Sequence, residues 1–258
     1  MTTTFPGGTS ITLLGVYDDL APDGLAGGSP HLHLASTECY IVVGGSGVLQ
    51  TVDAGGYRET ALIPGVVVWF TPGTIHRAVN RGGLQVVVLM DNAGLPEAGD
   101  AVMTFPADVV GDPNRYRASA TLPTRASVPE RARDAAARRD LAVEGFITIR
   151  DAVIGGDERP LRKFHAAAAR IVEERAGRWA SIVSEGPLAK AKVSLAVVGE
   201  LARGRFGHLA DSALLRAPDP DGERTFGMCG RLRAYDVGGA DRLPPQRPAR
   251  RQDGEPAA

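Results

Sequence analysis

The sequence predicts an α+β protein in which an N-terminal antiparallel β-barrel or sandwich precedes a helical region. Two observations lead to this prediction. Over residues 10–105, short segments rich in Val, Ile, Leu and aromatic residues alternate with glycine- and proline-containing turns, as in antiparallel barrels. Beyond residue 130, apolar residues recur instead every three or four positions, which is the helical period.

Seven segments of the first part are expected to be strands. Glycine pairs such as Gly44-Gly45 and Gly82-Gly83 separate them, because glycine adopts the positive φ that turns require. The expected strands are Ser10–Tyr17, Pro30–Leu34, Glu38–Val43, Gly47–Val52, Gly65–Phe70, Ile75–Asn80 and Leu84–Met90.

Three amphipathic helices are expected after the barrel, with apolar stripes over residues 141–153, 161–182 and 188–202. Three short helices bury only a modest core, so this unit should pack on itself and also against the barrel or a second chain. Residues 227–237 then have some strand character, and we expect this segment to return to the barrel.

These patterns divide the chain into four parts. The segment between barrel and helices contains prolines and little periodicity, so it is expected to be a connector. The last residues are rich in Pro, Arg and Gly and offer few apolar side chains to bury, so we expect them to be disordered. The predicted division is a barrel over 1–110, a connector over 111–129, a helical region over 130–240 and a disordered tail over 241–258.

The composition excludes several classes of protein. The formal net charge is −1, so we expect neither nucleic acid nor a membrane surface as a partner. Residues 1–110 carry three basic and ten acidic residues, whereas residues 130–210 carry fifteen basic and eleven acidic ones, which suggests two units of opposite charge. The N-terminus lacks a signal-peptide pattern and the apolar runs are short, so a cytoplasmic location is expected.

A segment with two histidines and a glutamate is the strongest chemical signal. His31 and His33 are two residues apart on an expected strand, so their imidazoles point to the same face. Glu38 follows after four residues, enough for a turn that returns it beside them, and His76 follows a later Pro-Gly turn. Three imidazoles and one carboxylate suit one divalent transition metal and leave two open positions in an octahedron.

This order of residues resembles the two signature motifs of the cupin superfamily. The matching pattern is His-x-His, four residues and Glu, followed later by Pro-Gly, two residues, His, three residues and Asn80, with Gly47 and Gly65 at structural glycine positions. The resemblance covers about residues 10–105 and does not extend to the helices. It implies a double-stranded β-helix, or jelly-roll barrel, whose metal ligands are His31, His33, Glu38 and His76.

The resemblance implies a small-molecule function but leaves the reaction open. The first hypothesis is a metal-dependent cupin enzyme acting on a small oxygen-rich metabolite, as a dioxygenase or an isomerase or epimerase, with Fe, Mn, Ni, Zn or Cu as its metal. Glu38 and Tyr40, which have the same parity on their strand, are the candidate catalytic residues. The alternative is a non-catalytic cupin sensor that binds a small molecule and whose helices mediate dimerisation or regulation.

Other side chains near the motifs have simpler expected roles. Cys39 has the opposite parity to the ligands and is expected to be a buried structural thiol. Trp69, Gln50 and Arg77 are candidate pocket residues, and of these Arg77, which alternates with His76, is expected to lie outside the cavity. Strand edges and apolar helices together predict a homodimer.

Overall fold

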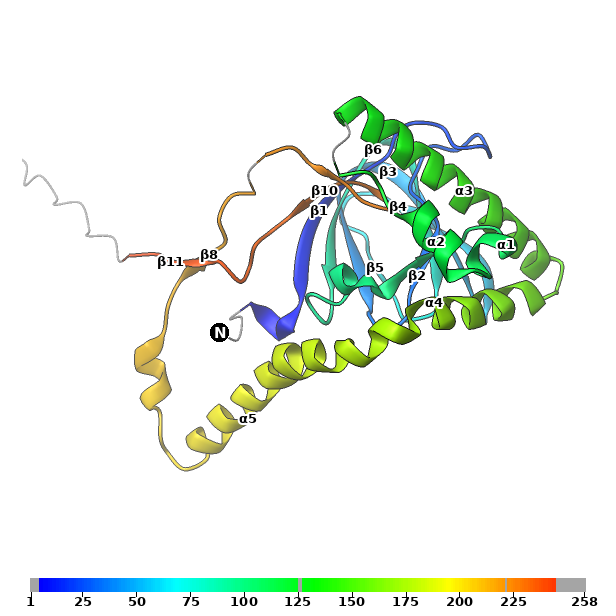
Figure 1. The fold of residues 1–258 in the computed structure, drawn as a ribbon. Helices are drawn as coiled ribbons and strands as arrows, with labels where there is room; N and C mark the ends of the chain where they lie inside the picture. Colours follow the sequence, from blue (N-terminus) through cyan, green and yellow to red (C-terminus); the bar gives the residue numbers. More distant parts are fainter. Residues whose placement is uncertain (1–4, 125–126, 221, 245–258) are drawn as a thin grey trace, which may run out of the picture.

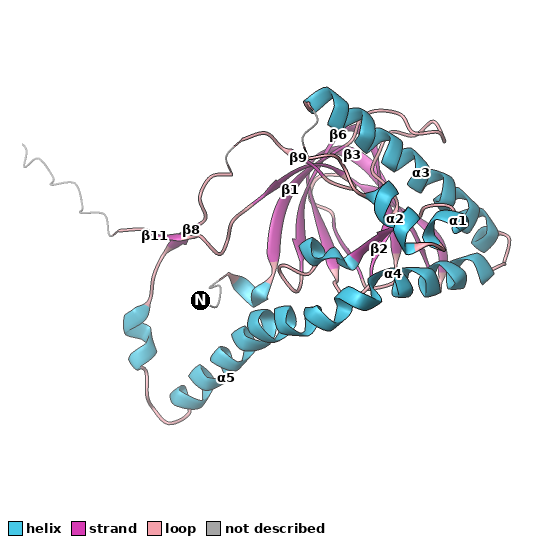
Figure 2. Cartoon of the chain, viewed as in Figure 1, coloured by secondary structure: helices cyan, strands magenta, loops and turns pink. Residues whose placement is uncertain are grey.

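The computed structural model describes residues 5–124, 127–220 and 222–244. A barrel of strands lies beside helices α3 and α4, while α5 extends away from the barrel (Figures 1 and 2). The expected α+β architecture, a double-stranded β-helix barrel followed by helices, is confirmed. The strands are β1 (Ser10–Val16), β2 (His31–His33), β3 (Glu38–Asp53), β4 (Gly56–Leu62), β5 (Val67–Phe70), β6 (Ile75–Met90), β7 (Ala101–Met103), β8 (Leu215–Arg216), β9 (Thr225–Phe226), β10 (Gly230–Ala234) and β11 (Asp241–Arg242).

The main sheet is organised around two long strands. Its order is β4-β3-β6-β1-β10-β9, with β5 paired to β3, and β2 paired to both β6 and β7. The sequence predicted two short strands in place of β3 and two in place of β6, because glycine pairs interrupt both. In the structure the glycines bend the strands instead of ending them, and the register of β3 on β6 shifts between Val42 and Gly47. A Cβ on Gly45, which has φ +68°, would lie 2.2 Å from backbone atoms of Gly83.

The segment after the helices returns to the barrel, as its strand character predicted. Strand β10 pairs antiparallel with β1, from Thr12 opposite Ala234 to Val16 opposite Gly230. A Cβ at Gly230 would lie 2.1 Å from the carbonyl oxygen of Gly15, so only glycine fits at this close approach. The region 130–240, which was expected to be helical, therefore also contains strands β8, β9 and β10.

Helices α3 and α4 pack against the barrel. Helix α3 begins after a capping box in which the backbone N–H of Ser127 donates to the Glu130 carboxylate at 2.7 Å. Gly145 brings α3 close to the chain after β7, since a Cβ there would lie 2.0 Å from the Thr104 carbonyl oxygen. The helices are α1 (Ala107–Val110), α2 (Pro113–Ala120), α3 (Val128–Ile154), α4 (Arg159–Val183) and α5 (Ala189–Leu201), with helical turns η1 (Pro6–Gly8), η2 (Pro96–Asp100), η3 (Ser184–Leu188) and η4 (Gly207–Asp211).

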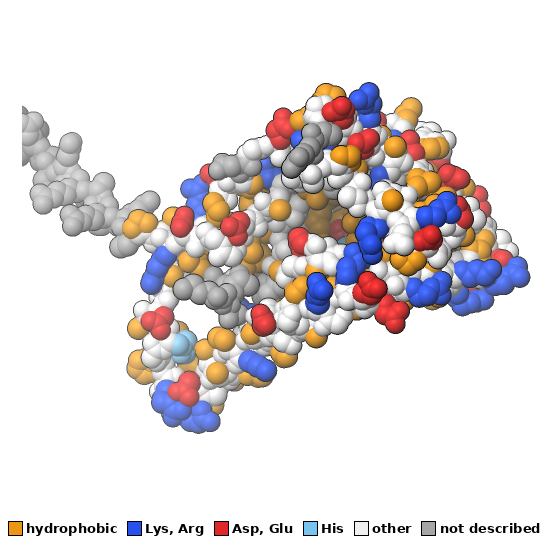
Figure 3. All heavy atoms as spheres, viewed as in Figure 1, with side chains coloured by type: hydrophobic (Ala, Val, Ile, Leu, Met, Phe, Trp, Pro, Cys, Tyr) orange, Lys and Arg blue, Asp and Glu red, His pale blue; other side chains and the backbone are white. Residues whose placement is uncertain are grey.

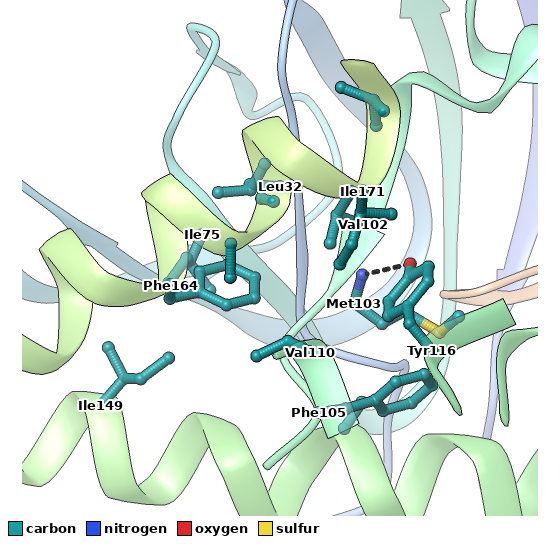
Figure 4. Close-up of a cluster of buried hydrophobic side chains, with 14 of the residues drawn as sticks. Leu32, Ile75, Val102, Met103, Phe105, Val110, Tyr116, Ile149, Phe164 and Ile171 are labelled. Carbon is teal, nitrogen blue, oxygen red and sulfur yellow. Dashed lines mark hydrogen bonds between the residues drawn. The ribbon is translucent and has the colours of Figure 1, made fainter. Parts of the chain in front are cut away.

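The apolar side chains form two clusters. One fills the barrel interior and includes Leu14, Leu49 and Val86. The other lies between the helices and the β2–β7 side of the barrel, and Figure 4 shows part of it. There the Tyr116 hydroxyl accepts a hydrogen bond from the backbone N–H of Met103 at 3.0 Å. The first two predicted helical stripes contribute to this second cluster.

The third predicted stripe, on α5, is not buried by the described part of the chain. None of the α5 residues is buried, and beyond the adjoining η3 this helix contacts mainly η1. None of the described helices combines the length and the apolar character that a membrane-spanning segment needs.

Candidate metal centre

Four buried side chains from three strands converge inside the barrel. His31 and His33 come from β2, Glu38 begins β3, and His76 is the second residue of β6, directly opposite His31 in the ladder. One nitrogen or oxygen atom from each lies within 4.8 Å of those of the other three. Their exposed fractions lie between 0% and 6%. The strand alternation used in the sequence analysis therefore places these four residues together.

The centre of this cluster contains polar atoms without hydrogen-bond partners. The Glu38 Oε2 atom lies 3.1 Å from His33 Nε2 and 3.2 Å from His76 Nε2. Within the described residues, neither Glu38 Oε2 nor His76 Nε2 makes a hydrogen bond. Burying such atoms unpaired costs free energy, and a cation bound among them would offset that cost. The donor set and these unpaired atoms fit a divalent metal ion.

Outer contacts fix the orientation of the imidazoles. The Nδ1 atoms of His31 and His76 lie 2.9 and 3.2 Å from the carbonyl oxygens of Ser29 and Thr74. An imidazole that donates from Nδ1 to a carbonyl keeps the lone pair on Nε2, where a metal can bind it. His33 Nδ1 instead lies 3.3 Å from a carboxylate oxygen of Asp100.

Asp100 is a buried neighbour of the cluster that sequence reasoning missed. Its carboxylate accepts backbone N–H groups of Leu34, Ala35 and Ser36 at 2.8–3.1 Å, which fixes the turn between His33 and Glu38. It ends η2, outside both histidine motifs, and only the pairing of β7 with β2 brings it to this place. No local pattern in the sequence identifies it.

The shifted pKa values follow from this arrangement. Burial, with the nearby His76 and His33, holds the pKa of His31 well below its ordinary value. Burial would also lower the pKa of His33, but the nearby carboxylates of Asp100 and Glu38 raise it to about 9. Burial would raise the pKa of Glu38, yet His33 and His76 hold it below its usual range. The pKa of His33 is therefore raised by the two carboxylates in spite of its burial.

Comparison with protein families identifies this barrel. The family model of the cupin domain matches residues 17–90, which include all four clustered residues. The barrel is a cupin domain. A comparison with curated proteins finds no match for the sequence.

Several solved structures resemble part of the chain. The TDP-fucose-3,4-ketoisomerase WlaRA from Campylobacter jejuni is 16% identical, with 31% of this chain and 58% of that chain covered and a TM-score of 0.27. A structure of the DMSP lyases RdDddP and RnDddQII is 21% identical over 36% of this chain and 41% of that one, with a TM-score of 0.27. An oxalate oxidase bound to the substrate analogue glycolate is 19% identical over 35% and 53%, with a TM-score of 0.24. This chain spans less than two thirds of each of these proteins.

Tyr40 lies in the cupin barrel interior, beside a cysteine that the sequence analysis did not single out. Tyr40 is fully buried, and its hydroxyl lies 3.5 Å from the Cys229 sulfur. That sulfur lies 4.0 Å from Nδ1 of His31, so the segment before β10 reaches the cluster. Burial, with the nearby Glu38 charge, raises the pKa of Cys229 to about 12, and its thiol is therefore neutral.

The other residues considered from the sequence lie outside the cluster. Gln50 is buried but donates to Tyr57 and Glu59 on β4, away from the four clustered residues. Arg77 is fully buried outside the cavity, as expected, where it pairs with Asp23. The structure therefore gives no pocket role to Gln50 or Arg77.

Cys39 and Trp69, both considered in the sequence analysis, lie side by side on the outer face of the cupin barrel. Cys39 was expected to be buried but is only partly buried. Trp69, opposite Cys39 in the ladder, is 68% exposed. Trp69 also borders a small cavity.

This small cavity, of about 340 Å³, lies among β3, β4 and β5, and its lining includes none of the four clustered residues. Its wall includes Phe70, whose ring lies 4.0 Å from the His76 ring, and Thr51, which is opposite His76 in the ladder. The lining residues are Leu49, Thr51, Asp53, Arg58, Thr60, Val67, Val68, Trp69, Phe70 and Thr74.

Proposed function

We propose that this protein is a metal-dependent cupin enzyme acting on a small oxygen-rich metabolite, as a dioxygenase or as an isomerase or epimerase. The observation that supports this most is the convergence of four buried donor groups, with central polar atoms that lack hydrogen bonds. His31, His33, Glu38 and His76 would hold one divalent transition metal, of the group Fe, Mn, Ni, Zn and Cu. Such a metal supplies Lewis acidity or oxygen activation when bound.

Two side chains of the barrel interior, Glu38 and Tyr40, are the acid–base groups that we assign to the reaction. Glu38 is the carboxylate nearest to His33 and His76, and we assign it as general base. Burial, with the nearby Cys229 and Glu38, raises the pKa of Tyr40 well above its ordinary value. The Tyr40 hydroxyl therefore stays protonated, and we assign it as a hydrogen-bond donor to the substrate.

The small cavity among β3, β4 and β5, separated from His76 by Phe70 and Thr51, is the site that we propose for a compact polar substrate. Its volume of about 340 Å³ lies at the lower end of the range for ligand sites. Threonine hydroxyls and the guanidinium of Arg58 offer hydrogen bonds to hydroxyl, carbonyl or carboxylate oxygens. Arg58 already pairs with Asp53 at 2.7 Å, so a bound carboxylate would compete with that ion pair.

Metal analysis of the purified full chain tests the metal site. We expect close to one equivalent of transition metal per chain, and its loss in His33→Ala and His76→Ala. His208→Ala is the matched control, because His208 lies outside the cluster in η4 and this variant should retain the metal. Full metal retention in the His33→Ala/His76→Ala double variant would refute the assignment.

The sensor hypothesis is supported by a second cavity. This cavity, of about 730 Å³, lies between α1, α3 and α4 and is lined by apolar residues such as Phe105, Ile149 and Phe164. On α4, His165 Nε2 lies 2.9 Å from the carbonyl oxygen of Gly73, in the turn before His76. A ligand between these helices would thus be connected to the metal cluster through α4.

A metabolite screen separates the two hypotheses. Turnover of a metabolite that disappears in Glu38→Gln supports the enzyme, and repeating it under air and under nitrogen distinguishes an oxygenase from an isomerase. Ligand-induced thermal stabilisation without any turnover supports the sensor.

A further inference from the structure

The cavity of about 730 Å³ between α1, α3 and α4, which we call the helical cavity, is separate from the cluster in the barrel. Its described lining residues include none of the four clustered residues. Figure 1 shows α1 lying between α3 and α4, on the side of the molecule where the helices pack. The volume lies within the range of sites that hold small organic ligands.

The floor of the helical cavity is apolar. Four of its lining residues are large hydrophobic side chains with exposed fractions of only 1–6%, namely Phe105, Val110, Ile149 and Phe164 (Figure 4). On the α4 side, Ala166 and Ala167 line the cavity, and their single methyl groups leave space that longer side chains would fill. The apolar part of a ligand placed on this floor would be removed from water, which favours its binding.

The rim of the helical cavity carries basic side chains from α4. Arg159, Lys163 and Arg170 are exposed and line the cavity at spacings of four and seven residues, which place them on one face of the helix. Figure 3 shows basic side chains along α4, with hydrophobic and a few acidic side chains between them.

The charges on this rim do not cancel. Asp157 accepts two hydrogen bonds from the Arg159 guanidinium at 2.9 Å, so these two lining residues neutralise one another. Lys163 and Arg170 form no ion pair with any described residue, and Glu144 is the other acidic residue of the described lining. Two cations therefore face one carboxylate, and the rim has a net positive charge.

We propose that the helical cavity binds an amphipathic carboxylic acid, whose apolar chain enters between the helices and whose carboxylate pairs with Lys163 and Arg170 at the rim. Seven residues of helix span about 10 Å, so both long side chains can reach a carboxylate placed beside the exposed Ala166 between them. A sugar fits this floor poorly, because its hydroxyl groups would be buried without hydrogen-bond partners. An amine fits the positively charged rim poorly.

This assignment names the ligand class for the sensor alternative, and it rests on that alternative rather than on the metal chemistry. Phe105 and Phe164 of the cavity floor belong to the same apolar cluster as Leu32 and Ile75, the neighbours of the clustered histidines on β2 and β6. Binding in the helical cavity would therefore stabilise the layer that packs against those strands. Binding itself requires neither metal nor turnover, so failure of this proposal and failure of the metal site are distinguishable.

Isothermal titration calorimetry of the full chain with hexanoate, octanoate and decanoate tests the proposal. We expect saturable binding of one acid per chain that tightens about threefold for each added methylene, because each is buried on the apolar floor. Octan-1-ol and octylamine should bind at least about tenfold more weakly than octanoate. Absence of saturable binding at millimolar decanoate, equal affinities across the three acids, or an alcohol that binds as tightly as the acid would each overturn the proposal.

Substitutions on α4 place the acid in the helical cavity. Lys163→Gln/Arg170→Gln should weaken octanoate binding about tenfold or more, whereas Arg178→Gln, at an exposed arginine of α4 outside the lining, should leave it unchanged. Ala166→Phe should fill the opening and weaken binding about tenfold or more. Ala169→Phe is its matched control, because Ala169 is also exposed on α4 but is not a lining residue.

The small cavity among β3, β4 and β5 also offers a cation to a carboxylate, since Arg58 lines it. Arg58→Gln should leave octanoate binding unchanged, and loss of binding in this variant would place the acid in the small cavity. That result, or binding unchanged in both Lys163→Gln/Arg170→Gln and Ala166→Phe, would overturn the proposal. The comparison of acids, alcohol and amine uses the unsubstituted chain, so it tests the proposal even where a variant does not fold.

Discussion

The four-residue cluster in the barrel and the C-terminal arm, residues 184–215, both contain side chains that the described residues leave unsatisfied, but in opposite ways. Inside the barrel, Glu38 Oε2 and His76 Nε2 are buried without hydrogen-bond partners in the described structure. On the arm, Leu195 and its apolar neighbours remain exposed. Unpaired buried polar atoms favour an ion as the partner of the cluster, and uncovered apolar side chains favour an apolar surface as the partner of the arm. The cluster, with polar atoms, and the arm, with apolar side chains, would therefore accept different kinds of partner.

The largest expected effect is a loss of unfolding free energy when a buried aromatic residue, rather than an exposed one, is replaced by alanine. Phe146 is fully buried between α3 and the barrel, so Phe146→Ala should lower the free energy of unfolding by about 3–5 kcal/mol. Phe206 on the arm is mostly exposed, so Phe206→Ala should change it by less than about 0.5 kcal/mol at concentrations where the protein is monomeric. Urea unfolding measures both values. Equal losses would show that the arm packs on its own chain.

Metal removal should give the next largest effect. Chelation should lower the thermal midpoint, because a ligand at one hundred times its Kd stabilises a folded protein by about 2.7 kcal/mol. Thermal unfolding with and without metal measures the difference. Glu38→Gln should abolish most of this difference in thermal midpoint. An unchanged metal-dependent shift in this variant would contradict the role of Glu38 as a ligand.

Asp100 should affect metal affinity through His33. Asp100→Asn removes the carboxylate that lies 3.3 Å from His33 Nδ1, and such outer-shell changes cost about 10–100-fold in affinity. Metal titration measures the change. Asp91→Asn is the control, because Asp91 accepts the backbone N–H of Thr37 but lies outside the cluster. If both variants bind metal equally well, Asp100 supports only the turn.

The smallest expected effect is the contribution of the Asp23–Arg77 ion pair to the stability of the protein at low pH. Burial would raise the pKa of Asp23, but its hydrogen bonds and attraction to Arg77 lower that pKa below the ordinary 3.8. A carboxyl with a lowered folded-state pKa stabilises the protein above its unfolded value, and this stability is lost as pH falls through the folded value. Stability should therefore fall below about pH 4. Asp23→Asn should flatten that part of the pH profile, and an unchanged profile would contradict this role.

The fold and the cluster could be predicted from the sequence because both follow from local alternation. His31 and His33 share a face whatever the rest of the chain does, and the Pro-Gly turn before His76 is a short-range signal. The joined strands were missed because glycine at positions 44–45 indicates a turn in the sequence, whereas here it allows two backbones to approach. Strand β4, with its polar Arg58 and Glu59, shows no clear apolar pattern.

The missed site residues depend on long-range packing. Asp100 reaches His33 only through the pairing of β7 with β2, and Cys229 reaches His31 only because β10 returns to β1. Neither residue has a motif of its own. The α5 stripe was recognised as helical, but periodicity cannot show which surface a helix will meet.

X-ray absorption spectroscopy of the zinc-loaded protein tests the central claim most directly. We predict a shell of imidazole nitrogen and carboxylate oxygen at about 2.0–2.2 Å, with the scattering pattern of three imidazoles. The same spectrum from the His76→Ala variant should show fewer imidazoles. A sulfur neighbour at about 2.3 Å would instead place Cys229 on the metal, and a shell without imidazoles would show that the metal binds elsewhere. Either result would contradict a metal centre formed by His31, His33, Glu38 and His76.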